Sequence, residues 1–265
     1  MPELPEVETI RLQLAEKLVG KQIVGIKVLL PKQFQGEVEE VIGARIIDVG
    51  RRAKILLIHL DNDRSILIHL KLTGQLIWAP KTELPGKTTH IIFEINDGRL
   101  FFNDLRAFGW VRVIRGFGDF GDFGVEPFSK DFTVEYLGRV FAGTSRPVKL
   151  VLMDQTKIAG IGNIYANEAL WEAGILPAKP AKNLENLEIE KLRNSILVVL
   201  KEGIKYGGAS AADEAYVKPN GSKGKYQEHF RVYQRGGQPC WRCGGLIKRV
   251  SLGGRGTFFC PVCQK

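Results

Sequence analysis

The first six residues, Met-Pro-Glu-Leu-Pro-Glu, combine an amine and two carboxylates that could do covalent chemistry. Removal of the initiator methionine before a small residue would leave Pro2 with a free α-amine, a group whose pKa is ordinarily about 7.7–8.0. Because this amine is secondary, its attack on a sugar C1′ gives a cationic iminium, an electron sink for later elimination. Glu3 is adjacent, and Glu6 follows. In the simpler alternative, Pro2 only opens a helix whose positive end the acids favour.

All four cysteines lie near the end of the chain, in two Cys-x2-Cys pairs separated by 16 residues, a spacing typical of zinc ribbons. Two such pairs form a closed tetrahedral thiolate site, which is structural rather than catalytic. The enclosed Gly253-Gly254-Arg255-Gly256 predicts the tip of a β-hairpin that presents Arg255, and so short a hairpin needs metal to hold it. We therefore expect one structural zinc ion per chain, bound by Cys240, Cys243, Cys260 and Cys263.

The segment Gly160-Ile161-Gly162-Asn163 precedes a helical stretch that we expect to end at Leu176-Pro177. Free N–H groups at the positive end of a helix bind anions, so the segment is a candidate phosphate site. A simple tight turn is the commoner explanation of such a motif, and the motif alone does not decide between the two.

The charge distribution favours a polyanionic partner. The formal net charge is +9, and residues 201–265 hold 12 basic and 4 acidic side chains, a net of +8. A solubilising basic surface is the alternative. No apolar run approaches the ~20 residues of a membrane span, and no cationic segment precedes an apolar h-region. We expect a cytoplasmic protein with no membrane partner.

The elements that must position these groups follow from the apolar pattern. Helical spacing from Val7 to Leu18, with Gly20 as a stop, predicts a leading helix. Short apolar runs between turn signals then predict a β-sandwich or barrel over residues 1–115. Examples of the predicted strands are Ile23–Leu30, Ala44–Val49, Lys54–Leu60, Ser65–Leu72, Ile91–Ile95, Leu100–Asn103 and Trp110–Ile114.

The rest of the chain divides into three parts. Residues 116–133 are a glycine-rich linker that Phe117, Phe120 and Phe123 could pin to a surface. Residues 134–226 are a helical domain, with a further helix near 188–206 and a polar stretch, 209–226, that is either a substrate-capping loop or disordered. Residues 227–265 are the zinc-ribbon hairpin. The predicted fold class is therefore α+β and multidomain.

Taken together, the motifs resemble the bacterial formamidopyrimidine-DNA glycosylases from end to end. The segments that carry the resemblance are Pro-Glu-Leu-Pro-Glu-Val-Glu at the start, Arg52-Ala53-Lys54, His69-Leu70-Lys71-Leu72-Thr73-Gly74, Asn103-Asp104-Leu105-Arg106-Ala107-Phe108-Gly109, Gly160-Ile161-Gly162-Asn163-Ile164-Tyr165, and Gly254-Arg255-Gly256-Thr257 with its flanking cysteines.

The resemblance implies an N-terminal β-sandwich, a C-terminal helix–two-turn–helix and a zinc-stabilised hairpin, with DNA as the partner. It implies excision of 8-oxoguanine and formamidopyrimidines, followed by β,δ-elimination at the abasic site, by a monomer associated with the bacterial nucleoid. Pro2 matches the Schiff-base nucleophile and Glu3 the acid that opens the sugar. Lys54 matches the catalytic lysine, and Arg255 matches the hairpin arginine of δ-elimination.

The same resemblance assigns DNA contacts. Asn163 matches a phosphate ligand, while Lys149, His69 and His90 fall at positions on the DNA side. Base extrusion leaves a hole in the duplex that side chains must fill. The matching positions hold Leu72, Arg106 and Phe108.

Departures from the family pattern concern this filling. Leu72 replaces a methionine and is less adaptable than a thioether. Leu105 and Ala107 replace a proline and a basic residue, which puts loop stiffness and opposite-base preference in doubt. The match in residues 209–226 is too weak to assign base contacts, and Tyr216 is the only candidate there.

Two other functions remain open. One is an endonuclease VIII-type glycosylase for oxidised pyrimidines, a branch that typically has Gly where this chain has Leu4. The other is a non-enzymatic zinc-ribbon module that binds nucleic acid, against which Pro2 and Glu3 argue. Trapping of a covalent protein–DNA adduct by borohydride would separate an enzyme from a binding module.

Overall fold

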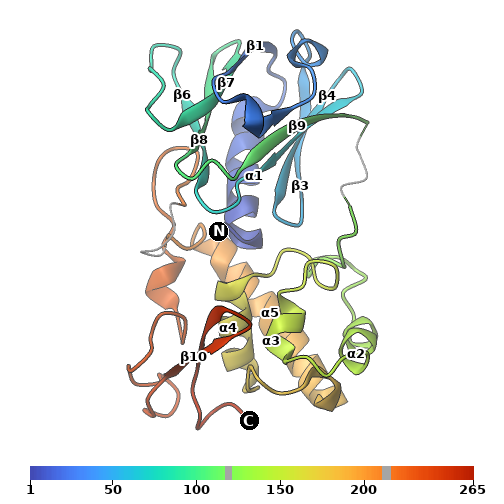
Figure 1. The fold of residues 1–265 in the computed structure, drawn as a ribbon, viewed down its shortest axis with the longest axis vertical. Helices are drawn as coiled ribbons and strands as arrows, with labels where there is room; N and C mark the ends of the chain where they lie inside the picture. Colours follow the sequence, from blue (N-terminus) through green and yellow to red (C-terminus); the bar gives the residue numbers. More distant parts are fainter. Residues whose placement is uncertain (117–120, 211–215) are drawn as a thin grey trace. The chain divides into compact units, whose positions relative to one another are not determined.

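The computed structural model describes residues 1–116, 121–210 and 216–265, which form two compact units (Figure 1). The first unit joins residues 1–120 to residues 204–227, and the second joins residues 121–203 to residues 228–265. Chain segments distant in sequence therefore share each unit. Phe117 and Phe120, which we expected to pin the linker, lie outside the described residues.

The predicted helical domain, residues 134–226, differs from this grouping at its end, because residues 204–227 belong to the first unit. The cause is local bonding and burial. The backbone N–H of Ala209 donates to the carboxylate of buried Glu6, and Tyr216 is buried in the apolar core of the first unit. A carboxylate and an aromatic ring thus hold this segment to the sandwich.

The first unit consists of a leading helix and two β-sheets. One sheet has the strand order β1-β7-β8-β6, and the other β2-β9-β5-β4-β3. All pairings are antiparallel except the short parallel pair of β2 with β9. The elements are α1 (Leu4–Leu18), β1 (Ile23–Val28), β2 (Phe34–Gln35), β3 (Ile46–Arg52), β4 (Ile55–Leu60), β5 (Arg64–His69), β6 (Gly74–Ala79), β7 (Thr89–Ile95), β8 (Gly98–Asp104) and β9 (Trp110–Arg115), with 3-10 turns at Pro31–Gln33 and Val38–Glu40.

Both sheets and α1 contribute side chains to one buried apolar cluster. From α1 come Val7, Ile10, Leu14 and Leu18, the residues at helical spacing. Alternate residues of the strands supply most of the rest, as expected for sheets that pack face to face. The predicted leading helix and β-sandwich are confirmed.

The turn between β5 and β6 differs from the prediction. The apolar run Ser65–Leu72 predicts a strand to Leu72, but β5 ends at His69 and β6, which was not predicted, starts at Gly74. Lys71 takes a left-handed backbone (φ 52°), and the N–H of Gly74 donates to the carbonyl of Leu70. A Cβ at Gly74 would lie 2.5 Å from that carbonyl oxygen, so the turn requires glycine. Leu72 is thereby placed in a loop rather than on a strand.

The second unit contains helices and the C-terminal hairpin. The hairpin is antiparallel and places Leu252 opposite Arg255. The elements are α2 (Val134–Ala142), α3 (Val148–Leu152), α4 (Asn163–Ala173), α5 (Asn186–Lys205, whose last two residues belong to the first unit), β10 (Lys248–Leu252) and β11 (Arg255–Phe259), with 3-10 turns at Ala181–Asn183 and Tyr226–His229.

Helix α4 ends earlier than predicted. We expected it to end at Leu176-Pro177, but it ends at Ala173 because Gly174 takes the left-handed conformation (φ 74°) of a helix C-cap. Its start at Asn163 agrees with the glycine–asparagine motif. Among the described residues, no helix combines the length and apolar character needed to cross a membrane.

Candidate active site and metal centre

The N-terminus is fixed by a pair of buried carboxylates. Glu3 caps α1, and its backbone N–H donates to Glu6 Oε2 at 2.8 Å in a capping box. Glu6 Oε1 accepts the N–H of Ala209 at 2.8 Å. Pro2 and Glu3 are both buried. The predicted nucleophile and acid therefore lie next to each other on a backbone that hydrogen bonds hold at two points.

Lys54 lies in the two-residue turn between β3 and β4, after Ala53, whose φ is 54°. Its side chain is only 5% exposed. Burial first, and then the charges of Lys71 and Lys54, lower the pKa of His69 to about 3. The Nδ1 atom of His69 accepts the N–H of Lys71 at 3.0 Å, so the neutral ring carries its proton on Nε2. His69 is a neutral hydrogen-bond donor close to Lys54.

A buried carboxylate organises the loop between β8 and β9. Asp104 is 0% exposed, and its Oδ2 atom accepts the N–H of Gly109 at 2.7 Å. Its Oδ1 atom accepts the hydroxyl of Thr73 and, at 3.3 Å, the N–H of Arg106. Thr73 Oγ1 also accepts that N–H at 3.0 Å. One side chain thus ties the loop of Arg106 to the turn that holds Leu72.

Buried Gln33 extends this network toward His90. Its Nε2 donates to Asp104 Oδ2 at 2.8 Å and to the carbonyl of Gly109 at 2.9 Å. Its Oε1 bonds the Nδ1 of His90. His90, predicted on the DNA side, is therefore held by the same network as the loop.

The side chains predicted to fill the duplex project from this network. Phe108 is 55% exposed and Leu105 is 74% exposed, although both are apolar. The guanidinium of Arg106 lies 5.0 Å from the centre of the Phe108 ring, within cation–π range. Leu72 is half-buried in its turn. The Asp104 carboxylate thus joins the turn that carries Leu72 to the loop that carries Arg106 and Phe108.

In the second unit, Lys149 differs from the expected surface cation. It is 0% exposed, and its Nζ donates to the carbonyl of Gly256 at 3.0 Å and to Thr257 Oγ1 at 2.7 Å. Asn167 makes a parallel link, since its Oδ1 accepts the N–H of Phe258 at 2.8 Å and its Nδ2 donates to the carbonyl of Asn163 at 2.6 Å. Both side chains tie the hairpin to the helices, and Asn163 is the first residue of α4.

The hairpin presents Arg255. Gly253 and Gly254 both have positive φ, 56° and 72°, as the favoured two-residue hairpin turns require. Arg255 follows them as the first residue of β11, and its side chain is exposed. The predicted hairpin tip is present.

The four cysteines form a metal centre at the base of the hairpin. Their sulfur atoms all lie within 4.8 Å of one another, with Cys240 and Cys263 3.9 Å apart and Cys243 and Cys260 3.5 Å apart. Four thiolates about 2.3 Å from a tetrahedral zinc would be about 3.8 Å apart, so the set fits one structural zinc ion. Trp171 Nε1 donates to Cys240 Sγ at 3.4 Å, which orients that ligand.

Several of these residues were not predicted from the sequence. Glu6 was interpreted as an acid near a helix dipole, although its Glu3-x-x-Glu6 spacing is that of a capping box. Asp104 lay inside a quoted motif without an assigned role. Gln33 and Asn167 carried no sequence signal. Tyr216, the candidate base contact, is instead buried in the core, and its hydroxyl donates to the carbonyl of Gly207.

A β-sandwich with a leading helix, a helical unit and a four-cysteine hairpin define the class of helix–two-turn–helix DNA-repair enzymes. Three family models match the chain: "Formamidopyrimidine-DNA glycosylase N-terminal domain" over residues 1–111, "Formamidopyrimidine-DNA glycosylase H2TH domain" over 123–214, and "Zinc finger found in FPG and IleRS" over 237–265. The chain belongs to the formamidopyrimidine-DNA glycosylase (Fpg) family.

Individual relatives agree along the full length. The formamidopyrimidine-DNA glycosylase of Pelotomaculum thermopropionicum is 42% identical over 100% of this chain and 99% of its own. A mutant Lactococcus lactis Fpg in complex with Fapy-dG-containing DNA is 34% identical with a TM-score of 0.91, and both chains are covered in full. The wild-type L. lactis enzyme, bound to DNA that contains an oxidised pyrimidine, is 35% identical with a TM-score of 0.92 and the same coverage.

Proposed function

We propose that this protein is a bifunctional base-excision repair enzyme, a glycosylase that removes 8-oxoguanine and formamidopyrimidines from duplex DNA and cuts the abasic strand by β,δ-elimination. Its substrates are duplexes with oxidised bases or abasic sites. It acts as a monomer in the cytoplasm, at the bacterial nucleoid. The names and DNA complexes of its relatives support this substrate class.

The first chemical step belongs to the N-terminus. The neutral secondary amine of Pro2 attacks C1′ of the damaged nucleotide, the glycosidic bond breaks, and the proton lost from the Pro2 nitrogen leaves with the base. Glu3 protonates the ring oxygen, the sugar opens, and a cationic iminium links Pro2 to C1′. The fixed position of Glu3 next to Pro2 supports this division of roles.

The iminium then drives two eliminations. Loss of a proton next to the iminium carbon expels the 3′ phosphate, and a second elimination expels the 5′ phosphate. Hydrolysis of the remaining iminium frees Pro2. We assign Lys54 and Arg255 to the strand phosphates in these steps, since a cation stabilises the departing phosphate charge. Asn163, His69 and His90 bind the backbone.

Excision requires the base to leave the stack, at a cost of a few kcal/mol. Arg106 hydrogen-bonds the orphaned partner base, while Phe108 and Leu72 fill the gap. The exposure of Phe108 on a loop that Asp104 fixes supports this role, because an apolar ring held in water is available for insertion.

The observation that carries the proposal is the N-terminal geometry, with Pro2 directly before a buried Glu3 whose backbone is held by Glu6. Borohydride should trap a covalent adduct with abasic or 8-oxoguanine DNA, and mass mapping should place the link at Pro2. Pro2→Gly, which supplies a primary amine, should impair base excision. A protein that retains Met1 should give no adduct. An adduct mapped to a lysine would refute the mechanism. The absence of any adduct would favour the non-enzymatic module that only binds nucleic acid.

A second activity, on oxidised pyrimidines, is favoured by one observation: the wild-type L. lactis relative binds DNA that contains an oxidised pyrimidine. Leu4, buried in the helix start, argues for purines as the main substrates. Cleavage of matched duplexes that carry 8-oxoguanine or an oxidised pyrimidine would rank the two activities.

A further inference from the structure

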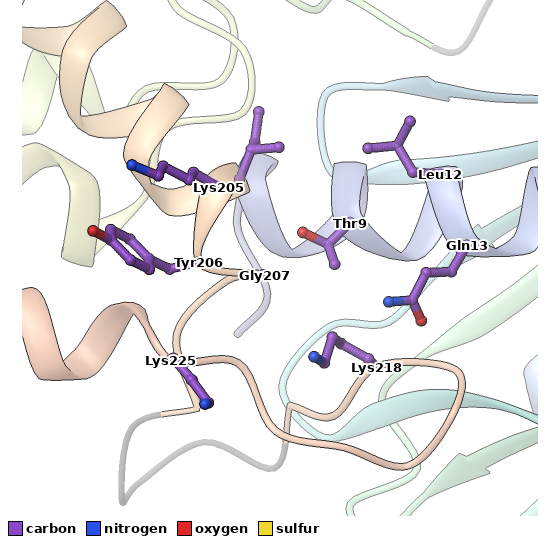
Figure 2. A pocket seen from close by; sticks show the side chains of 9 residues that line it. Thr9, Leu12, Gln13, Lys205, Tyr206, Gly207, Lys218 and Lys225 are labelled. Carbon is purple, nitrogen blue, oxygen red and sulfur yellow. The ribbon is translucent and has the colours of Figure 1, made fainter.

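The first unit contains a hollow of about 380 Å³ that none of the residues assigned above lines. Figure 2 shows its walls: α1 with Thr9, Leu12 and Gln13, and residues 204–207, which include the last two residues of α5. The third wall is the stretch that carries Lys218 and Lys225. All three belong to the first unit.

The hollow is basic. Three lysines line it, Lys205, Lys218 and Lys225, and none of its lining residues is acidic. Among residues 1–116, 121–210 and 216–265, no carboxylate pairs with these ammonium groups. Nearby Glu8 is occupied by Arg11 and Arg51. Within the described chain, the three lysines therefore have no carboxylate at ion-pair distance.

The lysines are held by short backbone links rather than by a loose loop. The N–H of Lys225 donates to the carbonyl of Tyr206 at 2.9 Å, and the N–H of Lys218 donates to the carbonyl of Ser222 at 2.8 Å. The stem of Lys218 crosses Gly207, where a Cβ would lie 3.4 Å from its Cδ. Lys205 Nζ lies 5.5 Å from the centre of the Tyr206 ring. The three lysines therefore line one hollow, and backbone hydrogen bonds hold the residues that carry Lys218 and Lys225.

The walls also offer apolar and aromatic surface. Leu12 is 43% exposed, and Tyr206 and Ile204 complete a surface against which a planar or sugar group could pack. A hollow of this size lies within the range of small-molecule sites. Lysine ammonium groups bind phosphate as point charges.

We propose that this hollow is a phosphate-binding subsite that takes a nucleoside monophosphate unit, with its phosphate on Lys205, Lys218 and Lys225 and its nucleoside against Leu12 and Tyr206. The unit comes either from a free nucleotide or from a DNA strand. The inference does not depend on the Schiff-base chemistry, because the site uses neither Pro2 nor Glu3.

The test uses the full-length, zinc-loaded protein with adenosine 5′-monophosphate as the probe, at low salt. Lysine side chains are labelled by ¹³C dimethylation and followed by NMR during titration. One variant carries Lys205→Ser, Lys218→Ser and Lys225→Ser. A control with the same charge change carries Lys32→Ser, Lys81→Ser and Lys87→Ser, three exposed lysines of the same unit. Leu12→Trp narrows the hollow without any change of charge.

The variant that lacks Lys205, Lys218 and Lys225 (the pocket variant) should bind adenosine 5′-monophosphate about tenfold or more weakly than the wild type, as expected for lost hydrogen bonds to a charged group. The charge-matched control should change it by less than about twofold, because distant exposed charges are screened. Leu12→Trp should also weaken it. Equal losses in the two triple variants, or none in the pocket variant, would show a diffuse basic surface and overturn the proposal.

A second arm identifies the source of the phosphate. Undamaged duplex is added to the protein with bound adenosine 5′-monophosphate. If the duplex displaces the nucleotide, the subsite binds a DNA strand. If the duplex and the nucleotide bind at the same time, the subsite binds a free nucleotide. Both results support the subsite. No lesion or covalent step is involved, so failure here leaves the trapping experiment unaffected.

Discussion

Two loops of this protein present an exposed arginine, and different chemistry holds each of them. The loop of Arg106 is closed by the buried carboxylate of Asp104, which accepts backbone and hydroxyl donors. The tip that carries Arg255 is a glycine turn, and two cysteines precede its hairpin and two follow it. The first loop depends on a charge inside the sandwich, and the second on a metal outside any large core. Each can therefore be broken without the other.

The largest effect should follow loss of zinc. Chelation, or Cys243→Ser, should unfold the hairpin, because binding of a structural zinc supplies on the order of 10 kcal/mol of folding free energy. DNA affinity should fall by at least about a hundredfold, while NMR signals of the sandwich stay in place. Zinc-free protein that bound lesion DNA at full strength would show that zinc has no part in positioning Arg255.

Loss of the Asp104 carboxylate, which closes the loop of Arg106, should have a smaller effect than loss of zinc. Asp104→Asn replaces an acceptor with a donor beside the N–H of Gly109 and should cost about 1–3 kcal/mol. The loss should appear in base extrusion, measured by 2-aminopurine fluorescence, with little change in affinity for undamaged DNA.

Phe108→Ala should likewise impair base extrusion and leave affinity for undamaged DNA nearly unchanged. The loss of affinity that it causes should be smaller on an abasic duplex, which needs no base extrusion.

The matched control is Asp97→Asn, which changes an exposed carboxylate paired with Lys21 in the same unit. It should leave extrusion unchanged. Equal losses for Phe108→Ala on intact, lesion and abasic duplexes would contradict a void-filling role and make the loop a backbone clamp.

A separate prediction concerns Lys149, which contacts the hairpin through Gly256 and Thr257. The sequence predicted a phosphate contact, which would flatten the log–log salt slope by roughly 0.9 on removal. Its buried ammonium, bonded to Gly256 and Thr257, predicts otherwise. Lys149→Met should lower stability by about 1–2 kcal/mol and weaken DNA binding with no change of slope. Arg255→Gln should flatten the slope and leave stability intact. If Lys149→Met flattened the salt dependence of DNA binding, Lys149 would be a phosphate contact after all.

A further effect concerns the dependence of stability on pH. The fold lowers the pKa of His69 to about 3, below its ordinary value, so the unfolded chain binds the proton first as pH falls. This contribution is complete above about pH 6.5 and is lost toward pH 3, at up to about 1.4 kcal/mol per pH unit. His69→Asn keeps an acceptor for the N–H of Lys71 and cannot titrate. Its urea midpoint should vary less between pH 7 and 4.5 than that of the wild type, whereas equal variation would show that other groups dominate acid sensitivity.

Much of the site follows from the sequence because its determinants are local. The Cys-x2-Cys pairs specify a tetrahedral thiolate set by spacing, and Gly253-Gly254 specifies a tight turn by its tolerance of positive φ. The position of Asn163 at a helix start follows from the glycines before it. Helical spacing in residues 7–18 fixed the face of α1 that enters the core.

The tertiary structure decided what joins distant parts of the chain. Glu6 meets Ala209 across 203 residues, Gln33 meets Asp104 across 71, and Lys149 meets Thr257 across 108. No local pattern encodes such pairs, because a buried polar group takes whichever partner the folded core brings within hydrogen-bond reach. For the same reason Lys149, which the sequence presented as a surface cation, is buried and bonded to the hairpin. Tyr216, which the sequence presented as a loop tyrosine, is a core residue.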